Sequence, residues 1–257
     1  IAITSDDSDT TLVSPTNTLT LVADSVTNLT VTGDAGLNLT YAGTTATTID
    51  ASGITAGAFT YDSGALAAAA TIKGSAAGTN TIDFSEGLGI VTYTGGTGND
   101  TINFAAANAL NNVITLGNGT NAFNGGTNAN GADTVTGGTG VDTILTGAGN
   151  DVIVGGGGAD QITGGTGADK ITISGNTADL FYAAAGGDTG TNTSTTIQTS
   201  ELTSTFDVIY GAVAGITISL GTTAGIDAAG YGGAGGATDD ITEAHTNLAG
   251  VADEIVF

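Results

Sequence analysis

Aspartate residues recur at regular spacing in a glycine-rich stretch of the sequence. Asp142, Asp151, Asp160 and Asp169 lie nine residues apart, and several glycines precede each of them. Carboxylate oxygens, together with the backbone carbonyl oxygens that glycine-rich turns expose, are the hard ligands that Ca²⁺ prefers. Transition metals favour His or Cys, and this stretch contains neither. The spacing therefore predicts a calcium-binding segment.

These aspartates belong to a repeating unit of the form G-G-x-G-x-D-x-U-x, in which U is a large apolar residue. Repeats of this form bind calcium in parallel β-helices. A flexible glycine-rich linker would have no reason to keep an acid and an apolar residue at fixed offsets. The units are GGTGNDTIN (95–103), LGNGTNAFN (116–124), GGTNANGADTVT with a three-residue insertion (125–136), GGTGVDTIL (137–145), TGAGNDVIV (146–154), GGGGADQIT (155–163) and GGTGADKIT (164–172).

The candidate ligands are the side chains at place six and the carbonyl oxygens of the turn glycines. Glycine at places one, two and four can adopt positive φ and turn its carbonyl oxygen toward a common point, which residues with a Cβ do reluctantly. The side-chain candidates are Asp100, Asn121, Asp133, Asp142, Asp151, Asp160 and Asp169. The glycine candidates are Gly95, Gly117, Gly119, Gly137, Gly138, Gly140, Gly147, Gly149, Gly155, Gly156, Gly158, Gly164, Gly165 and Gly167.

Places seven to nine of each unit are expected to form a short strand whose middle side chain points inward. Two units would make one coil, so each ion would lie between place-six side chains two units apart. Asp100 precedes an irregular stretch, and Asn112 is its best candidate partner. The inward column is Ile102, Phe123, Val135, Ile144, Ile153, Ile162 and Ile171. The contiguous array is expected to hold up to four ions, in the sandwiches Asn121/Asp142, Asp142/Asp160, Asp133/Asp151 and Asp151/Asp169.

The flanking segments are also rich in strand signals. Residues 1–94 contain short alternating stretches separated by Gly, Asp and Asn, which favour a β-solenoid that continues into the calcium-binding segment, with a sandwich as the alternative. Only 5% of residues are aromatic, so no wide aromatic core is expected. Residues 95–172 form the expected β-roll, and residues 173–257 a β-rich cap or assembly segment. The predicted fold class is all-β, a parallel β-solenoid with Ca²⁺ between its loops. The upstream strands are expected at 19–22, 29–33, 37–41, 47–50, 58–62, 71–74 and 81–84.

The charge of the chain excludes several classes of partner. The 257 residues include 25 acidic and only two basic residues, Lys73 and Lys170, giving a formal net charge of -23. Nucleic acid and anionic membrane surfaces would be repelled without a bridging cation. No apolar run is long enough to span a bilayer, so membrane insertion is not expected. Because cysteine is absent, disulfides and thiolate metal sites are excluded.

The nonapeptide units resemble those of RTX proteins, the calcium-dependent β-roll family of bacterial proteins exported by type I secretion. This resemblance implies export as an unfolded chain and folding outside the cell on meeting calcium. Phrases such as VTGDAGLNLT and TIDASGITAG ahead of a GGTGND array also resemble large RTX-bearing surface-layer proteins of Gram-negative bacteria. The second resemblance implies a structural protein of the cell surface that binds copies of itself.

The sequence is compatible with three classes of function. The first is a calcium-folded surface layer or filament, and the second is an adhesin in which the roll is a stalk and a flank binds a ligand, with cell-surface polysaccharide as a candidate partner. The third is part of a secreted RTX enzyme, but HExxH and GxSxG motifs are absent, and the single histidine, His245, is expected in a surface loop. No catalytic residue is therefore predicted. The acidic residues at 5–9 and the pair Asp239/Asp240 are expected as solvated loops, with extra calcium ligands as the alternative.

Overall fold

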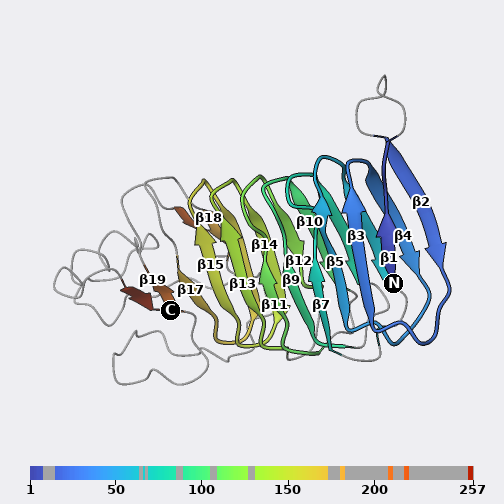
Figure 1. The fold of residues 1–257 in the computed structure, drawn as a ribbon. Coiled ribbons are helices and arrows are strands. Elements are labelled where there is room, and N and C mark those ends of the chain that lie inside the picture. The colour runs from blue at the N-terminus through green and yellow to red at the C-terminus, as the bar shows by residue number, and fades with distance from the viewer. Residues whose placement is uncertain are drawn as a thin grey trace, which may run out of the picture.

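The chain is a two-sided solenoid of short strands in the computed structural model (Figure 1). The structure describes residues 1–7, 15–63, 66, 69–84, 89–104, 109–126, 131–172, 180–182, 208–210, 217–219 and 254–256. All regular elements among these residues are strands. Over the same residues, the search for an apolar helix of membrane-spanning length finds none.

Successive strands alternate between two sheets, so each coil contributes one strand to each sheet. Sheet A has the order β1-β3-β5-β7-β9-β11-β13-β15-β17-β19-β21, and sheet B has the order β2-β4-β6-β8-β10-β12-β14-β16-β18-β20. Neighbouring strands are parallel throughout, except for the antiparallel pair β19 and β21. The parallel ladders confirm the predicted solenoid and exclude the alternative sandwich for the upstream strands.

The strands are short, as expected for coils of about two repeat units. Sheet A contains β1 (Ala2–Thr4), β3 (Asn28–Gly33), β5 (Thr48–Ile54), β7 (Ala70–Lys73), β9 (Val91–Thr94), β11 (Val113–Thr115), β13 (Thr134–Gly138), β15 (Val152–Gly156), β17 (Lys170–Thr172), β19 (Val208–Tyr210) and β21 (Glu254–Val256). Sheet B contains β2 (Thr16–Leu21), β4 (Gly36–Tyr41), β6 (Phe59–Ser63), β8 (Asn80–Phe84), β10 (Asp100–Phe104), β12 (Ala122–Asn124), β14 (Thr143–Ala148), β16 (Gln161–Thr166), β18 (Leu180–Tyr182) and β20 (Thr217–Ser219).

The upstream coils continue into the glycine-rich repeats without a break. β8 pairs with β10 in full register from Asn80↔Asp100 to Phe84↔Phe104, and β9 pairs with both β7 and β11. Each upstream strand predicted from the sequence overlaps an observed strand, from β2 to β8. The glycine-rich coils therefore stack directly on a folded solenoid.

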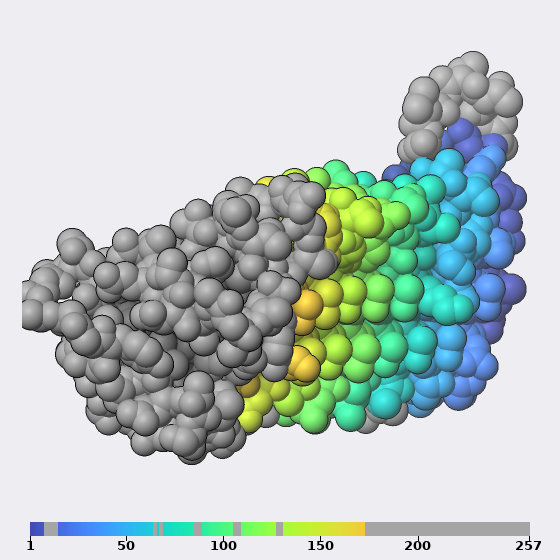
Figure 2. All heavy atoms as spheres, turned by 90° about the vertical axis from the view of Figure 1, so that its left-hand side faces the viewer, coloured from blue at the N-terminus to red at the C-terminus, as the bar shows by residue number. Residues whose placement is uncertain are grey.

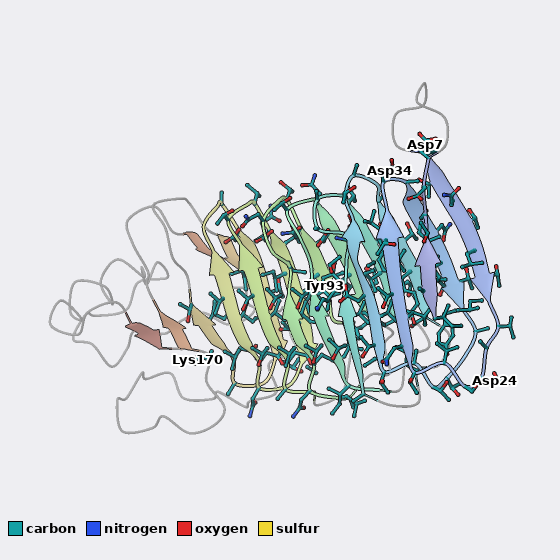
Figure 3. All side chains as sticks on the ribbon, in the orientation of Figure 1. Asp7, Asp24, Asp34, Tyr93 and Lys170 are labelled. Atoms are coloured by element: carbon teal, nitrogen blue, oxygen red, sulfur yellow. The ribbon has the colours of Figure 1, made fainter. Side chains whose placement is uncertain are left out.

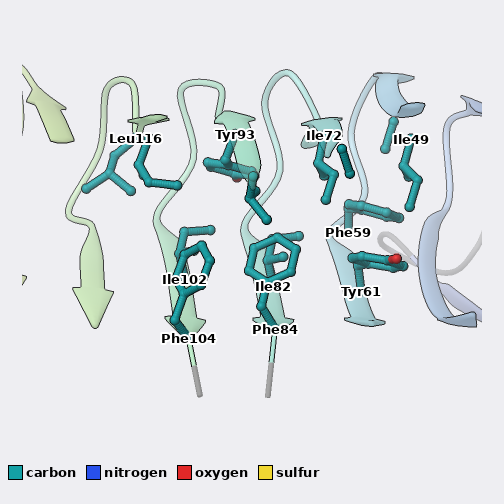
Figure 4. Packing of buried hydrophobic residues seen from close by; sticks show 14 of the residues in the cluster. Ile49, Phe59, Tyr61, Ile72, Ile82, Phe84, Tyr93, Ile102, Phe104 and Leu116 are labelled. Atoms are coloured by element: carbon teal, nitrogen blue, oxygen red, sulfur yellow. The ribbon is translucent and has the colours of Figure 1, made fainter. Parts of the chain in front are cut away.

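The core lies between the two sheets. The predicted inward column from Ile102 to Ile171 is confirmed, because its seven side chains are at most 2% exposed. The few aromatic residues are more concentrated than expected: Phe59, Tyr61, Phe84, Phe104 and Phe123 follow one another with ring centroids 4.8–6.3 Å apart. Figure 4 shows part of this row packed against the aliphatic column of the opposite sheet. A small number of rings thus fills the upstream half of the solenoid.

The apolar core becomes narrower along the chain. β4 buries three apolar side chains, Leu37, Leu39 and Tyr41, whereas β14 buries Ile144 as its one large apolar side chain. Glycine, threonine and place-six side chains take the remaining inward positions in the repeats. Since stabilisation by apolar burial scales with the area removed from water, at about 25 cal/mol per Å², the glycine-rich coils gain less of it per residue. They need another source of stability.

The outward faces of both sheets carry mainly small polar side chains. Thr71, Thr92 and Thr134 occupy one outward row of sheet A, and Val113 and Val152 occupy positions in the same row. Figure 2 shows side chains aligned in such rows across successive coils. β-branched side chains suit this pleated, half-exposed surface.

Replacement of a central ring tests the contribution of the aromatic row. Phe84→Ala removes a fully buried ring that contacts Tyr61 and Phe104. We expect a loss of about 3 kcal/mol or more in the free energy of unfolding of the upstream coils, because a cavity would remain. Urea unfolding in chelator measures this loss, with the outward Thr81→Ala on the same strand as control. Equal midpoints for the two variants would contradict a stabilising aromatic row.

Candidate calcium-binding site

The place-six side chains line the two long edges of the solenoid. We call the turns that lead from sheet A to sheet B the first edge, and those that lead from sheet B to sheet A the second edge. The first edge carries Asn80, Asp100, Asn121, Asp142 and Asp160, and the second edge carries Asn112, Asp133, Asp151 and Asp169. The predicted alternation of turns between two edges is thus confirmed.

Backbone hydrogen bonds stack these side chains from coil to coil. On the first edge, Asn121 N–H donates to Asp142 Oδ1 at 3.0 Å, and Asp142 N–H donates to Asp160 Oδ1 at 2.9 Å. On the second edge, Asp133 N–H donates to Asp151 Oδ1 at 2.7 Å, and Asp151 N–H donates to Asp169 Oδ1 at 2.8 Å. These contacts join the same four pairs that the sequence predicted as sandwiches.

The predicted pairing of Asp100 with Asn112 is wrong. Asp100 lies on the first edge, where its Oδ1 accepts Asn80 N–H at 3.0 Å and its own N–H donates to Asn121 Oδ1 at 2.8 Å. Asn112 lies on the second edge, where its N–H donates to Asp133 Oδ1 at 2.7 Å. The reason is that β10 belongs to sheet B and β11 to sheet A, so Asn112 lies on the second edge, and the next place-six side chain on the first edge is Asn121, which follows β11.

Asp142 and Asp151 are buried aspartates that each have one oxygen without a hydrogen bond. Asp142 is 0% exposed and Asp151 is 1% exposed, and the Oδ2 atom of each has no hydrogen-bond partner. A buried charged oxygen without a partner costs several kcal/mol unless a counter-charge compensates it. A cation bound at these oxygens would remove that penalty.

The protonation behaviour of these groups reflects the same penalty. Burial raises the pKa of Asp100, Asp133 and Asp142 to about 6, and the neighbouring carboxylates Asp151 and Asp160 contribute to this increase at Asp133 and Asp142 respectively. Burial also raises the pKa of Asp151. The basic side chain of Lys73 pairs instead with Asp50 at 3.1 Å on the outer face of sheet A. These pKa shifts indicate that the stacked place-six carboxylates favour a bound proton or a bound metal ion.

The glycines of the repeat serve two different purposes. The predicted positive φ is found at place two from Gly117 onward and at place four in Gly119, Gly149, Gly158 and Gly167, for example Gly156 at 102° and Gly158 at 140°. Gly140 and the first unit, with Gly96 and Gly98, do not have it. Place one does not have positive φ, so that part of the prediction is wrong. A Cβ at Gly137 would instead collide with Asp142 Oδ2 and with the carbonyl oxygen of Gly155. At Gly137, glycine is required because carboxylate and carbonyl oxygens converge on the space that a side chain would fill. Leu116 and Thr146 occupy place one in two other units.

This donor set fits Ca²⁺ although it contains few side chains. Among the residues that the structure describes, no group of three His, Cys, Asp or Glu side chains comes together. Each candidate site would combine two stacked place-six side chains with turn carbonyl oxygens, and such all-oxygen sets suit calcium. The ligands would be the stacked carboxylates from Asp133 onward and the glycine carbonyls of the same turns.

A second set of hydrogen bonds, which was not predicted from the sequence, joins the turns of neighbouring coils. Asn99 Oδ1 accepts Thr120 N–H at 2.9 Å, Asn111 Oδ1 accepts Ala132 N–H at 2.8 Å, and Asn150 Oδ1 accepts Ala168 N–H at 2.9 Å. Here the side chain belongs to the earlier coil, whereas in the place-six ladder it belongs to the later one. The available signal was asparagine directly before place six in three turns.

Several sequence-based candidates fall elsewhere. His245, Asp239 and Asp240 lie outside the described residues, as do most of residues 173–257. At the other end of the chain, Ser5 is buried and its hydroxyl donates to the Gly36 carbonyl at 2.8 Å, while Asp7 N–H donates to Asp34 Oδ1 at 2.8 Å. These contacts hold the first coil together.

Comparison with known proteins agrees with the motif. A family model described as the RTX calcium-binding nonapeptide repeat (4 copies) matches residues 127–162, 136–171 and 155–189. No curated protein and no solved structure matches the chain. The chain thus carries RTX calcium-binding repeats within a parallel β-solenoid, and RTX repeats in general bind Ca²⁺.

Two single substitutions test the stacking on the second edge. Asp151 is joined to both Asp133 and Asp169, whereas Asp169 is joined to Asp151 within the described coils. Asp151→Ala should therefore raise the calcium concentration at the folding midpoint by on the order of tenfold, and Asp169→Ala by less. Calcium titration followed by circular dichroism measures both midpoints. Equal shifts would argue against shared ions between neighbouring coils.

The pH dependence of the metal-free protein gives a separate prediction. Because burial raises the folded-state pKa of Asp133 and Asp142 to about 6, their contribution to stability is present at low pH and is lost as pH rises through about 6. In chelator, lowering the pH from about 7.5 to about 5.5 should therefore raise the free energy of unfolding by on the order of 1 kcal/mol per carboxylate. Urea unfolding at the two pH values measures this change. With calcium present the trend should reverse, since protons compete with the ion. A metal-free protein that loses stability on acidification would contradict buried, unpaired carboxylates.

Proposed function

Taking the RTX calcium-binding repeats as the premise, we propose that this chain is an extracellular structural protein that folds on calcium and assembles with copies of itself into a bacterial surface layer or filament. The observation that carries the proposal is the pair of buried columns in which Asp142 and Asp151 each keep an oxygen without a hydrogen bond. Such columns are unfavourable without a cation and favourable with one. Calcium would therefore decide when the roll folds.

The residues of the roll have separate tasks in this process. The carboxylates at place six bind the ion, the glycines at places two and four present carbonyl oxygens, and glycine at place one, as at Gly137, leaves space for these oxygens. Calcium supplies positive charge between coils, so that like-charged carboxylates can stack. The isoleucines Ile144, Ile153, Ile162 and Ile171 then close the thin core between the sheets.

This dependence suits a secreted protein. RTX repeat proteins are typically exported by type I secretion, from a cytosol poor in calcium to a medium that contains it. The glycine-rich coils, which are acidic and have a thin apolar core, stay unfolded before export, because their carboxylates repel one another and calcium is scarce. Folding follows on the outside of the cell. Binding free energy for the ion thus becomes folding free energy.

Self-assembly is supported by the outer surface. Both sheets present long faces of small side chains, and several apolar residues of the roll are exposed, among them Val113 (44%), Val141 (46%) and Val152 (38%). Flat, regular faces of this kind suit lateral contacts between copies. The net charge of -23 would oppose those contacts unless a divalent cation neutralised part of it. Calcium would thereby control both folding and packing.

The proposal assigns no catalytic role to any residue. An adhesin with the roll as a stalk, with surface polysaccharide as its ligand, is the alternative that the test below separates. The two functions differ in the behaviour of the folded protein: a layer protein grows into large particles, whereas a stalk stays monomeric and retains its ligand.

Calcium titration with simultaneous circular dichroism and light scattering tests the function. We expect the β structure of the roll and large particles to appear together as calcium rises, and both to disappear in excess EGTA. Mg²⁺ at the same concentration is the control, since its stricter octahedral geometry suits these turns poorly. Folding without particle growth at millimolar calcium would support the adhesin instead. Particles that persist in EGTA would contradict calcium-controlled assembly.

A further inference from the structure

The inward positions that are in register with the place-six side chains change in chemical type along the solenoid. On the first edge, in register, it passes from Leu37 and Phe59 to Asn80 and then to Asp100. On the second edge it passes from Ala70 and Val91 to Asn112 and then to Asp133. The second edge therefore runs from hydrocarbon through one amide to carboxylate, whereas on the first edge a second amide, Asn121, follows Asp100 before the carboxylates continue at Asp142. An amide stands at each junction.

The amide group of Asn80 lies where oxygen atoms converge. Its Nδ2 donates to Asp100 Oδ1 at 2.7 Å and to the carbonyl oxygens of Ser75 and Gly78 at 3.2 and 3.4 Å. Its Oδ1 accepts the Ser75 N–H at 2.6 Å. The set of acceptors around Nδ2, one carboxylate and two turn carbonyls, is the kind of set that a calcium ion would otherwise hold together.

Asn112 and Asn121 repeat this arrangement on the two edges. Asn112 Nδ2 donates to Asp133 Oδ1 at 3.0 Å and to the Leu110 carbonyl at 2.9 Å. Asn121 Nδ2 donates to the carbonyls of Gly117 and Gly119, at places two and four of its own turn, at 3.2 and 3.3 Å. In each case Oδ1 accepts a backbone N–H from the coil before. Only this orientation of the amide satisfies both of its ends.

Asp100 differs from the later aspartates because both of its oxygens are used. Oδ1 accepts the Asn80 amide and backbone N–H, and Oδ2 accepts the Tyr93 hydroxyl at 3.0 Å. Tyr93 is fully buried and stands in an otherwise aliphatic column between Ile72 and Ile114. Figures 3 and 4 show its ring inside the solenoid. The Oδ2 atoms of Asp142 and Asp151 have no hydrogen-bond partner.

From these contacts we infer that the coils up to Asn121 are a metal-free part of the solenoid, in which side-chain amides and the Tyr93 hydroxyl take the place of calcium. The ions then begin at Asp133 on the second edge and at Asp142 on the first. The described sites are Asp133/Asp151, Asp151/Asp169 and Asp142/Asp160. Asp100, Asn121 and the Asn121/Asp142 sandwich, which the sequence included among the ligands, do not hold an ion.

This division has a consequence for folding. The metal-free coils also contain the wide, aromatic part of the core, so they are held together by apolar burial and internal hydrogen bonds. Their last strands present backbone N–H and C=O groups with which the strands of the next coil can form hydrogen bonds. Calcium-dependent coils would add to this folded template, so the costly formation of a first coil would not depend on the ion. The inference rests on calcium binding by the roll, as does the proposed function.

Reciprocal substitutions in the full-length chain test the exchange of amide for ion. Asn121→Asp should add one bound calcium, because it removes the amide from the Gly117 and Gly119 carbonyls. Asp142→Asn should remove one calcium and raise the urea midpoint in chelator, because its new amide would face the equivalent carbonyls of Gly138 and Gly140. Asp142→Ala should remove one calcium without that gain. The control is Asn103→Asp, which adds a charge at an outward position of β10 and should leave the calcium count unchanged.

Hydrogen exchange of the unmodified protein in chelator keeps the test independent of the variants. We expect slow exchange in β3–β10 and fast exchange in β13–β17, with calcium slowing only the latter. Fast exchange in both regions, or loss of a bound calcium on Asn121→Ala, would overturn the inference. Absence of calcium binding anywhere would instead overturn the proposed function, while slow exchange in β3–β10 would still support a metal-free template.

Discussion

The stacking of carboxylates inside a solenoid is the constraint on which the glycine-rich half of this protein depends. Parallel strands repeat along the solenoid at about 4.8 Å, so whatever occupies an inward position in one coil meets its equivalent in the next. For isoleucine that repetition is favourable. For aspartate it places like charges side by side in a buried environment, as the raised pKa of Asp133 and Asp142 indicates. The same repetition that makes the fold simple makes it require a cation.

The two halves of the solenoid solve the problem of coil stability differently. Upstream coils fill the space between the sheets with large side chains, including the row from Phe59 to Phe123. The strands of the repeats each bury one large apolar side chain, and their turns contain glycine and carboxylate. Apolar burial is always available in water, whereas ion binding depends on the surroundings. A chain that combines the two can keep one part folded while the other responds to calcium.

Asparagine side chains occur where the coils stabilised by apolar burial meet the coils stabilised by ion binding. The asparagine amide can accept a backbone N–H with oxygen and donate to carbonyl or carboxylate oxygens with nitrogen, so it satisfies a ligand-rich turn without an ion. At Asn80 and Asn112 it stands between a hydrocarbon position and a carboxylate position. The asparagines Asn99, Asn111 and Asn150 brace the turn tips in the opposite direction along the solenoid. Side-chain amides therefore contribute to the coil-to-coil contacts on both sides of the junction.

The sequence by itself determined the nonapeptide unit, the inward apolar column, the upstream strands and the pairing of Asp142 with Asp160 and of Asp151 with Asp169. It could do so because period, glycine content and strand alternation are local properties. The tertiary structure alone decided the partner of Asp100, since the irregular sequence after β10 contains no repeat unit that fixes the edge on which Asn112 lies. It also decided why Gly137 at place one is glycine, and that Tyr93, seven residues before Asp100, reaches its carboxylate. Contacts between coils depend on how many residues each turn takes up, and only the folded chain defines that.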